Sequence, residues 1–104
     1  MARVTLELWM WMGKELGGDF YSPSEMSSIL ETEVEDGTDV RVFLNHLADQ
    51  YPAISKRVFD RAKKQVYPDV AVTFNDRVMG LNELYNEVLK DGDRVKAIQM
   101  YVGG

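Results

Sequence analysis

The sequence has 104 residues, which is enough for one domain and too few for a second hydrophobic core. Hydrophobic residues make up 45% of it and charged residues 28%, so a disordered or low-complexity chain is excluded. Seventeen acidic against twelve basic residues give a formal net charge of -5, and we expect no nucleic-acid partner.

The N-terminal third of the chain predicts two strands joined by a long connection. Apolar residues alternate with polar or aromatic ones at the start, which is the period of a strand with one face against a core. Gly-Gly and Ser-Pro-Ser then indicate a connection, with a helical turn over Lys14 to Leu16. A short apolar/acidic alternation over Ile29 to Glu35 predicts a second strand through Glu33 to Glu35 that pairs with the first. The inward residues of the first strand are Val4, Leu6, Leu8, Met10 and Met12.

The middle of the chain predicts the main helix. Asp36-Gly37 is a turn signal, and Thr38 is well placed to cap a helix whose first turn carries Asp39. Pro52 ends this helix, and a shorter helical piece is predicted from Ile54 to Ala62. The apolar residues that recur at helical spacing are Val40, Phe43, Leu44, Leu47 and Tyr51.

The C-terminal part predicts two more strands. Val70 to Phe74 alternates and is followed by an Asn75-Asp76 turn. Lys90-Asp91-Gly92-Asp93 is another turn signal, and Arg94 to Val102 reads as a strand that runs directly into Gly103-Gly104. The element order predicts a single α+β domain over residues 1–104, in which a small mixed sheet packs on one main helix and a flexible Gly-Gly tail follows.

Few residue types suited to catalysis are present. The chain has no cysteine and one histidine, His46, so we expect no disulfide, no bound metal and no bound cofactor, and we place His46 on the helix surface. The acidic run from Glu31 to Asp39 and the basic stretch from Asp60 to Lys64 are typical of solvated surface. The longest apolar stretch, Leu8 to Gly13, is far shorter than the roughly 20 residues of a membrane span, and no signal-type leader is apparent. We therefore expect a cytoplasmic protein with no membrane partner.

These motifs resemble those of the ThiS/MoaD family of β-grasp sulfur carriers, which are ubiquitin-like in fold. The pattern is most similar to that of MoaD-type small subunits of molybdopterin synthase. The resemblance covers most of the chain apart from residues 17–31. The residues that carry it are the opening strand, Glu35-Asp36-Gly37-Thr38, Val72-Thr73-Phe74-Asn75-Asp76, Leu89-Lys90-Asp91-Gly92-Asp93-Arg94-Val95 and Gly103-Gly104.

The resemblance implies a carrier rather than an enzyme. The α-carboxylate of Gly104 would be adenylated by an ATP-using, MoeB/ThiF-like activating enzyme and converted to a thiocarboxylate, while Gly103 would give the tail its freedom. A MoaE-like large synthase subunit in molybdenum or tungsten cofactor synthesis is the best-fitting acceptor. Carriers for cysteine, thiamine or tRNA thiolation, a ubiquitin-like modifier of lysines and an interaction domain with an inert Gly-Gly are the alternatives.

A partner surface is predicted on the outer face of the sheet. If the side chains of the last strand alternate, Val95 and Ala97 face the helix. Arg94, Lys96, Ile98 and Met100 then face outward. Trp9 and Trp11 would share that outer face. The alternatives are that they mark an interface with a partner, that they form the contact of a dimer, or that the long connection folds back over them as a small second core. The predicted partner-binding residues are Arg94, Lys96, Ile98, Met100, Trp9 and Trp11.

Overall fold

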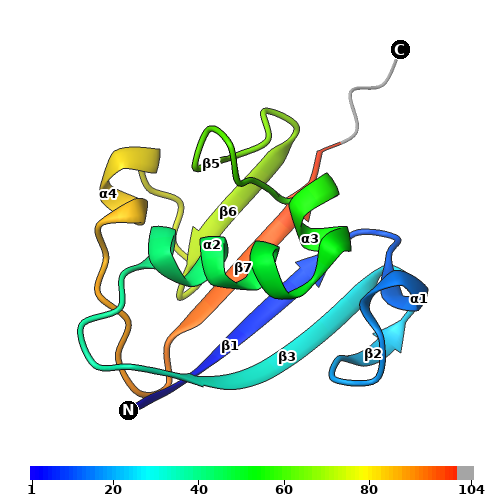
Figure 1. Cartoon of the computed structure of the whole chain (residues 1–104), viewed down its shortest axis with the longest axis horizontal. Helices are drawn as coiled ribbons and strands as arrows, with labels where there is room; N and C mark the ends of the chain where they lie inside the picture. The colour runs from blue at the N-terminus through cyan, green and yellow to red at the C-terminus, as the bar shows by residue number, and fades with distance from the viewer. Residues whose placement is uncertain (101–104) are drawn as a thin grey trace.

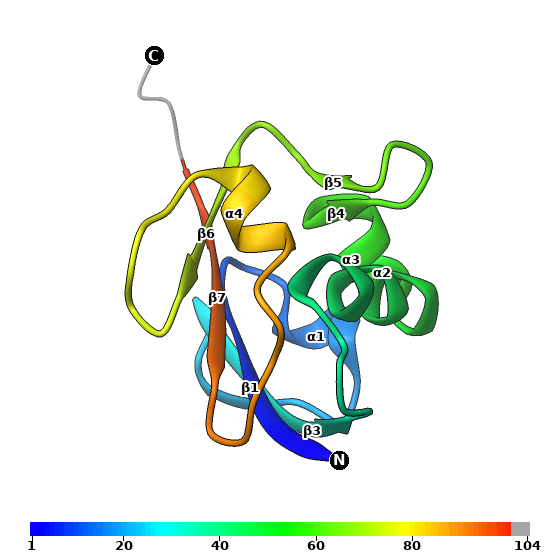
Figure 2. The ribbon, with the colours of Figure 1, turned by 90° about the vertical axis from the view of Figure 1, so that its left-hand side faces the viewer.

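The computed structural model describes residues 1–100, with residues 13 and 14 described through their backbone only. A five-stranded mixed sheet in the order β2-β3-β1-β7-β6 carries the main helices on one face, as Figures 1 and 2 show. This confirms the predicted α+β arrangement. The strands of this sheet are β1 (Ala2–Trp9), β2 (Tyr21–Ser24), β3 (Ser27–Val34), β6 (Val70–Phe74) and β7 (Arg94–Gln99).

The first and the last strand of the chain, β1 and β7, lie side by side in the sheet. β1 pairs in parallel with β7 and antiparallel with β3, so the first strand of the chain occupies the middle of the sheet. The other pairings, β2 with β3 and β6 with β7, are antiparallel. The inward side chains of β1 are almost completely buried, as the alternation predicts. Burial on one face and exposure on the other fixes the register of this strand.

The main helix α2 (Val40–Gln50) covers the inner face of the sheet, and it begins one residue later than its predicted cap implies. Asp39, not Thr38, is the N-cap: its Oδ1 accepts a hydrogen bond from the Val42 N–H at 2.8 Å. The Thr38 carbonyl instead accepts from the Leu89 N–H at 2.9 Å, so Thr38 belongs to the link with the C-terminal part of the chain.

Pro52 both ends α2 and begins α3 (Pro52–Arg57), because proline is suited to the first turn of a helix and not to its interior. The prediction of helix as far as Ala62 is wrong. Val58 and Phe59 are buried, but Phe59 already belongs to a short strand, because a β-branched and aromatic pair packs well in extended structure. Two short strands, β4 (Phe59–Asp60) and β5 (Gln65–Val66), form a small hairpin there.

Three short elements complete the fold. The predicted helical turn is α1 (Gly13–Leu16). The edge strand β2 and the helix α4 (Leu81–Tyr85) were not predicted: every residue of β2 is exposed and Pro23 interrupts its pattern, whereas α4 is too short to show a helical period. β7 ends at Gln99, and residues 101 and 102 of the predicted strand lie outside the described residues. None of the helices within residues 1–100 has the length and apolarity to cross a bilayer.

Candidate functional site

The predicted acceptor residues, Gly103 and Gly104, lie outside the described residues. What the structure describes is the place from which they continue. β7 lies between β1 and β6, and it ends on the side of the sheet opposite to the N-terminus (Figure 1). Directly after β7, the Met100 N–H donates to the Asp69 carbonyl oxygen at 2.8 Å. The last described residue, Met100, therefore lies beside Asp69 at this end of the sheet, directly after a strand that has a neighbour on each side.

The register of β7 is the predicted one. Val95 and Ala97 are fully buried against the helices. Between and beyond them, Arg94, Lys96 and Ile98 occupy the outer face, and Met100 is exposed. Their role in binding a partner stays a prediction, because the register establishes only which face they occupy.

An apolar patch lies on the outer face at the end of the sheet where β7 ends. We define it as Trp9, Ala71 and Ile98 of the strands, together with the exposed Trp11 and Met100, which follow β1 and β7 at the same end of the sheet. Trp9 is opposite Ile98, and Ile98 is opposite Ala71, so these side chains form one row across three strands. Trp9 is 46% and Trp11 50% exposed, and the interpretation that the long connection covers them as a second core is therefore wrong.

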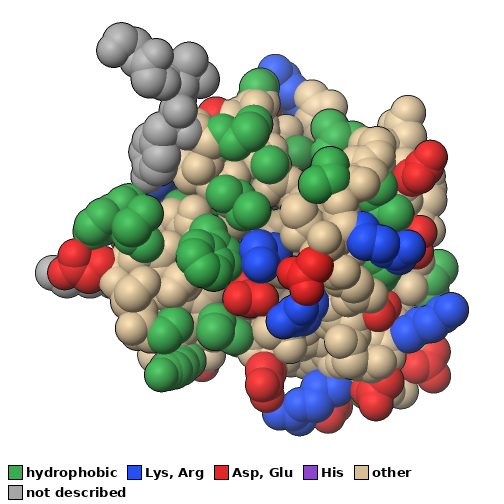
Figure 3. Space-filling model, turned by 180° about the vertical axis from the view of Figure 1, so that it is seen from behind, with side chains coloured by type: hydrophobic (Ala, Val, Ile, Leu, Met, Phe, Trp, Pro, Cys, Tyr) green, Lys and Arg blue, Asp and Glu red, His purple; other side chains and the backbone are tan. Residues whose placement is uncertain are grey.

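Figure 3 shows this face of the molecule. Hydrophobic side chains gather over its upper and left parts, whereas charged side chains dominate its centre and lower right. Large side chains left half exposed on one contiguous surface are typical of an interaction site.

The two cations predicted on this face are engaged by the protein's own carboxylates. Asp76 binds both of them: its Oδ2 accepts from Arg94, and its Oδ1 lies 3.4 Å from the Lys96 Nζ. Glu7, opposite Lys96 in the register, is 4.0 Å from Arg94. The Lys96 ammonium also lies 5.4 Å from the Trp9 ring centroid, over its face.

Asp76 is the residue of this group that sequence reasoning missed. It belongs to the Asn75-Asp76 turn, in which both residues have positive φ, a conformation that Asn and Asp tolerate. The turn signal was visible in the sequence, but the pairing across the sheet to β7 was not. The cluster holds the cations in fixed positions next to the apolar patch.

The other candidate residues do not form a second site. His46 is exposed on α2, as predicted. Glu31, from the acidic run, pairs with Arg3 at 3.1 Å on the surface. Within residues 1–100, no three His, Asp or Glu side chains come close enough to hold a metal ion. Burial, then the hydrogen bond to Asp19 at 3.0 Å and the charge of that carboxylate, raise the pKa of Tyr51.

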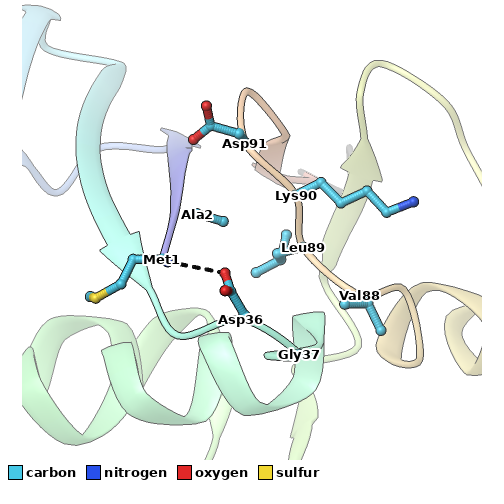
Figure 4. Close-up of a pocket in the computed structure, with 8 residues that line it drawn as sticks. All are labelled: Met1, Ala2, Asp36, Gly37, Val88, Leu89, Lys90 and Asp91. Carbon is cyan, nitrogen blue, oxygen red and sulfur yellow. Dashed lines mark ion pairs between the residues drawn. The ribbon is translucent and has the colours of Figure 1, made fainter.

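A pocket of about 310 Å³ opens at the start of β1 (Figure 4). Two carboxylates in its lining are already paired, Asp36 with the Met1 amine at 3.1 Å and Asp91 with the Arg3 N–H at 2.8 Å. Because β1 and β7 run parallel, the start of β1 and the end of β7 lie at opposite ends of the sheet. The pocket is therefore separate from the apolar patch.

Comparison with solved structures defines the class of fold. Small archaeal modifier protein 1 from Haloferax volcanii superposes with a TM-score of 0.70 at 19% identity, covering 99% of this chain and all of that one. A Pyrococcus furiosus protein provisionally assigned as molybdopterin converting factor, subunit 1, gives 0.65 at 20% identity, covering 97% and 100%. Small archaeal modifier protein 1 from Methanosarcina acetivorans gives 0.66 at 24%, covering 100% and 98%. The chain thus has the ubiquitin-like β-grasp fold.

The sequence itself identifies the family. The ThiS family model matches residues 23–104, and the chain belongs to the ThiS family. No curated protein matches the sequence significantly. The family match confirms the resemblance stated from the strand, turn and Gly-Gly motifs.

Proposed function

We propose that this protein is a cytoplasmic sulfur carrier whose Gly104 carboxylate is adenylated and then converted to a thiocarboxylate. The observation that carries the proposal is the match to the ThiS family, which runs through the Gly103-Gly104 that follows β7. The chain is then a co-substrate. The catalytic groups and the ATP site belong to its partner, a MoeB/ThiF-like adenylyltransferase.

The chemistry explains why a carrier without cysteine can transfer sulfur. A carboxylate is a poor acyl electrophile and must first gain a leaving group. A Gly104 carboxylate oxygen attacks the α-phosphorus of ATP, a new P–O bond forms, and pyrophosphate leaves. Hydrosulfide then attacks the carbonyl carbon, the C–S bond forms as the C–O bond to AMP breaks, and one proton is released. The product thiocarboxylate carries the sulfur on the glycine itself.

We propose molybdenum or tungsten cofactor synthesis as the pathway, with a MoaE-like large synthase subunit as the sulfur acceptor. Its support is the sequence pattern together with the fold shared with the Pyrococcus furiosus protein. Purified carrier charged with thiocarboxylate is expected to deliver sulfur to the dithiolene precursor when the large subunit is present. Delivery to a thiazole precursor, an activated serine or a tRNA instead would identify another member of this class of pathways.

The first test is the intact mass of the untagged protein after incubation with ATP, sulfide and the activating enzyme of its own host. We expect a mass increase equal to the replacement of one oxygen by sulfur, located by fragmentation at Gly104. Omission of ATP is the control and should leave the mass unchanged. No increase, with an activating enzyme that charges its other substrates, would refute the proposal.

A ubiquitin-like modifier is the second candidate. The fold shared with two small archaeal modifier proteins favours it, and the first chemical step is the same acyl-adenylate. The two functions differ in the nucleophile that displaces AMP, which is sulfide for a carrier and a lysine amine for a modifier. Immunoblots of host lysates are expected to show the free protein alone if it is only a carrier. A ladder of heavier conjugates that disappears without Gly103-Gly104 would favour the modifier.

The apolar patch is expected to dock the activating enzyme, and Ile98→Asp tests this. Ile98 lies in the middle of the row between Trp9 and Ala71, so a charge there would be buried unpaired in the complex. We expect affinity for the activating enzyme to fall at least about tenfold, measured by calorimetry, with little change in Tm.

Val78→Asp is the matched control for this prediction. Val78 is also an apolar side chain, 87% exposed, but it follows the turn at the opposite end of β6. It should bind like the wild type. Equal losses in the two variants would mean that added negative charge, not the patch, weakens the complex.

A further inference from the structure

At the end of β7, three polar side chains outside the apolar patch are linked by hydrogen bonds: Arg57, Gln99 and Asp69. Gln99, the last residue of β7, breaks the alternation of its strand with a half-buried amide. Its Nε2 donates to Asp69 Oδ2 at 2.5 Å, and its Oε1 accepts from Arg57 Nη2 at 3.5 Å. Because a carboxylate only accepts and a guanidinium only donates, these neighbours determine the orientation of the amide.

Arg57 connects these hydrogen bonds to the segment that follows β1. It is the last residue of α3, and its Nη1 donates to the Trp11 carbonyl oxygen at 2.6 Å. The same nitrogen lies 3.8 Å from Glu15 of α1. Arg57 therefore links the segment after β1 to the end of β7.

Asp69 accepts two hydrogen bonds from the end of β7 and the residue after it. Its carboxylate binds the Gln99 amide, and its carbonyl oxygen accepts from the Met100 N–H. Arg57 and Asp69 thus hold Gln99 from opposite ends of its amide. Partly exposed polar contacts of this kind contribute little to stability, so their number at one point calls for a role other than folding.

We propose that Arg57, Gln99 and Asp69 are positioning residues that fix the direction in which the chain leaves β7. The inference rests on the proposed function. When the apolar patch docks on the activating enzyme, the enzyme's ATP lies at a fixed direction from the body of the carrier. A fixed exit from β7 restricts the directions in which Gly104 is presented, and so it lowers the entropy that must be lost before the carboxylate meets the α-phosphorus.

The test measures binding to the activating enzyme separately from the rate at which Gly104 is adenylated. Arg57→Ala and Gln99→Met are compared with the wild type in pyrophosphate release by the activating enzyme, at varied carrier concentration, to obtain kcat and KM. We expect kcat to fall roughly tenfold, since misplaced reacting groups cost one to two orders of magnitude. Binding of Gln99→Met lacking Gly103-Gly104 should stay within about twofold of the matched wild type, because this variant changes no patch residue and keeps the bond from Arg57 to the Trp11 carbonyl.

Arg61→Ala is the matched control. Arg61 also loses an exposed ion pair, with Asp49 at 2.6 Å, but this pair joins the β4–β5 turn to α2 and not to β7. Its kcat should equal that of the wild type. Thermal melts of all variants show whether each one folds, and Gln99→Met, which removes no charge, keeps the inference testable if Arg57→Ala does not fold.

A rescue experiment adds a readout that a general loss of stability would not give. Gln99→Glu places a carboxylate against Asp69 and should lower kcat. Adding Asp69→Asn supplies a donor to that carboxylate, while Arg57 can still bind it, and the double variant should recover most of the wild-type kcat.

Three results would overturn the inference. The first is a wild-type kcat in both Arg57→Ala and Gln99→Met. The second is a loss of affinity in the truncated Gln99→Met variant that accounts for its slower reaction. The third is a double variant no faster than Gln99→Glu alone. Failure of the proposed function looks different, because the wild type itself would then gain no sulfur, whether or not it releases pyrophosphate.

Discussion

Adding one alanine after Gly104 is expected to abolish thiocarboxylate formation and to leave the Tm unchanged. The addition converts the reacting carboxylate into an amide and moves the new carboxylate about 3.5 Å along the chain. It also places a Cβ where the sequence has only glycine. Displacements of this size separate the reacting atoms from the α-phosphorus, and we expect a loss of more than about a hundredfold in the rate of charging. Intact mass spectrometry after a fixed time measures it.

The matched control adds the same alanine before Met1. The Met1 amine pairs with Asp36 on the surface at the other end of the sheet, and loss of such an exposed pair changes stability little. This variant should charge like the wild type. If the C-terminally extended protein also charges at the wild-type rate, Gly104 is not the acceptor and the mechanism proposed above is wrong.

The central strands could be predicted from the sequence because their pattern is produced by burial itself. β1 alternates over its whole length, and its inward residues are the ones that the sheet buries against α2. The same argument gave the register of β7 from Val95 and Ala97. Where one face of a strand is buried and the other is not, hydrophobicity alone records the orientation.

The parts that could not be predicted depend on contacts between distant segments. β2 has no alternation because its four residues are all exposed, and it exists through its pairing with β3. Asp39 replaces Thr38 as the cap because the Thr38 carbonyl is bound to Leu89, which is far along the chain. Asp76 and Asp69 each act across the sheet on β7, and no local pattern marks such a partner.

On the outer face of the sheet, the alternation in the sequence predicts which side chains share the face, and the structure shows which of them are neighbours. Alternation correctly predicted that Trp9 and Ile98 share this face, but only the register shows that they are direct neighbours. Alternation also placed Arg94 and Lys96 there, but only the structure shows that Asp76 binds both. Asp76 therefore balances part of the positive charge that the sequence predicts on this face, next to the row formed by Trp9, Ile98 and Ala71.

Leu44→Ala is expected to lower the free energy of unfolding by about 2 to 5 kcal/mol, the largest stability effect that we predict. Leu44 is fully buried on α2, so the truncation loses apolar contact and leaves a cavity between the main helix and the sheet. Urea unfolding should show a lower midpoint with an unchanged slope, because the surface exposed on unfolding stays nearly the same.

Val42→Ala, on the same helix, is the control for this prediction. Val42 faces solvent with 42% of its surface exposed, and alanine favours a helix more than valine does. Its free energy of unfolding should stay within about 0.5 kcal/mol of the wild type. Equal effects at the two positions would mean that α2 does not pack on the sheet through Leu44. A large difference would instead show that α2 packs on the inner face of the sheet through Leu44.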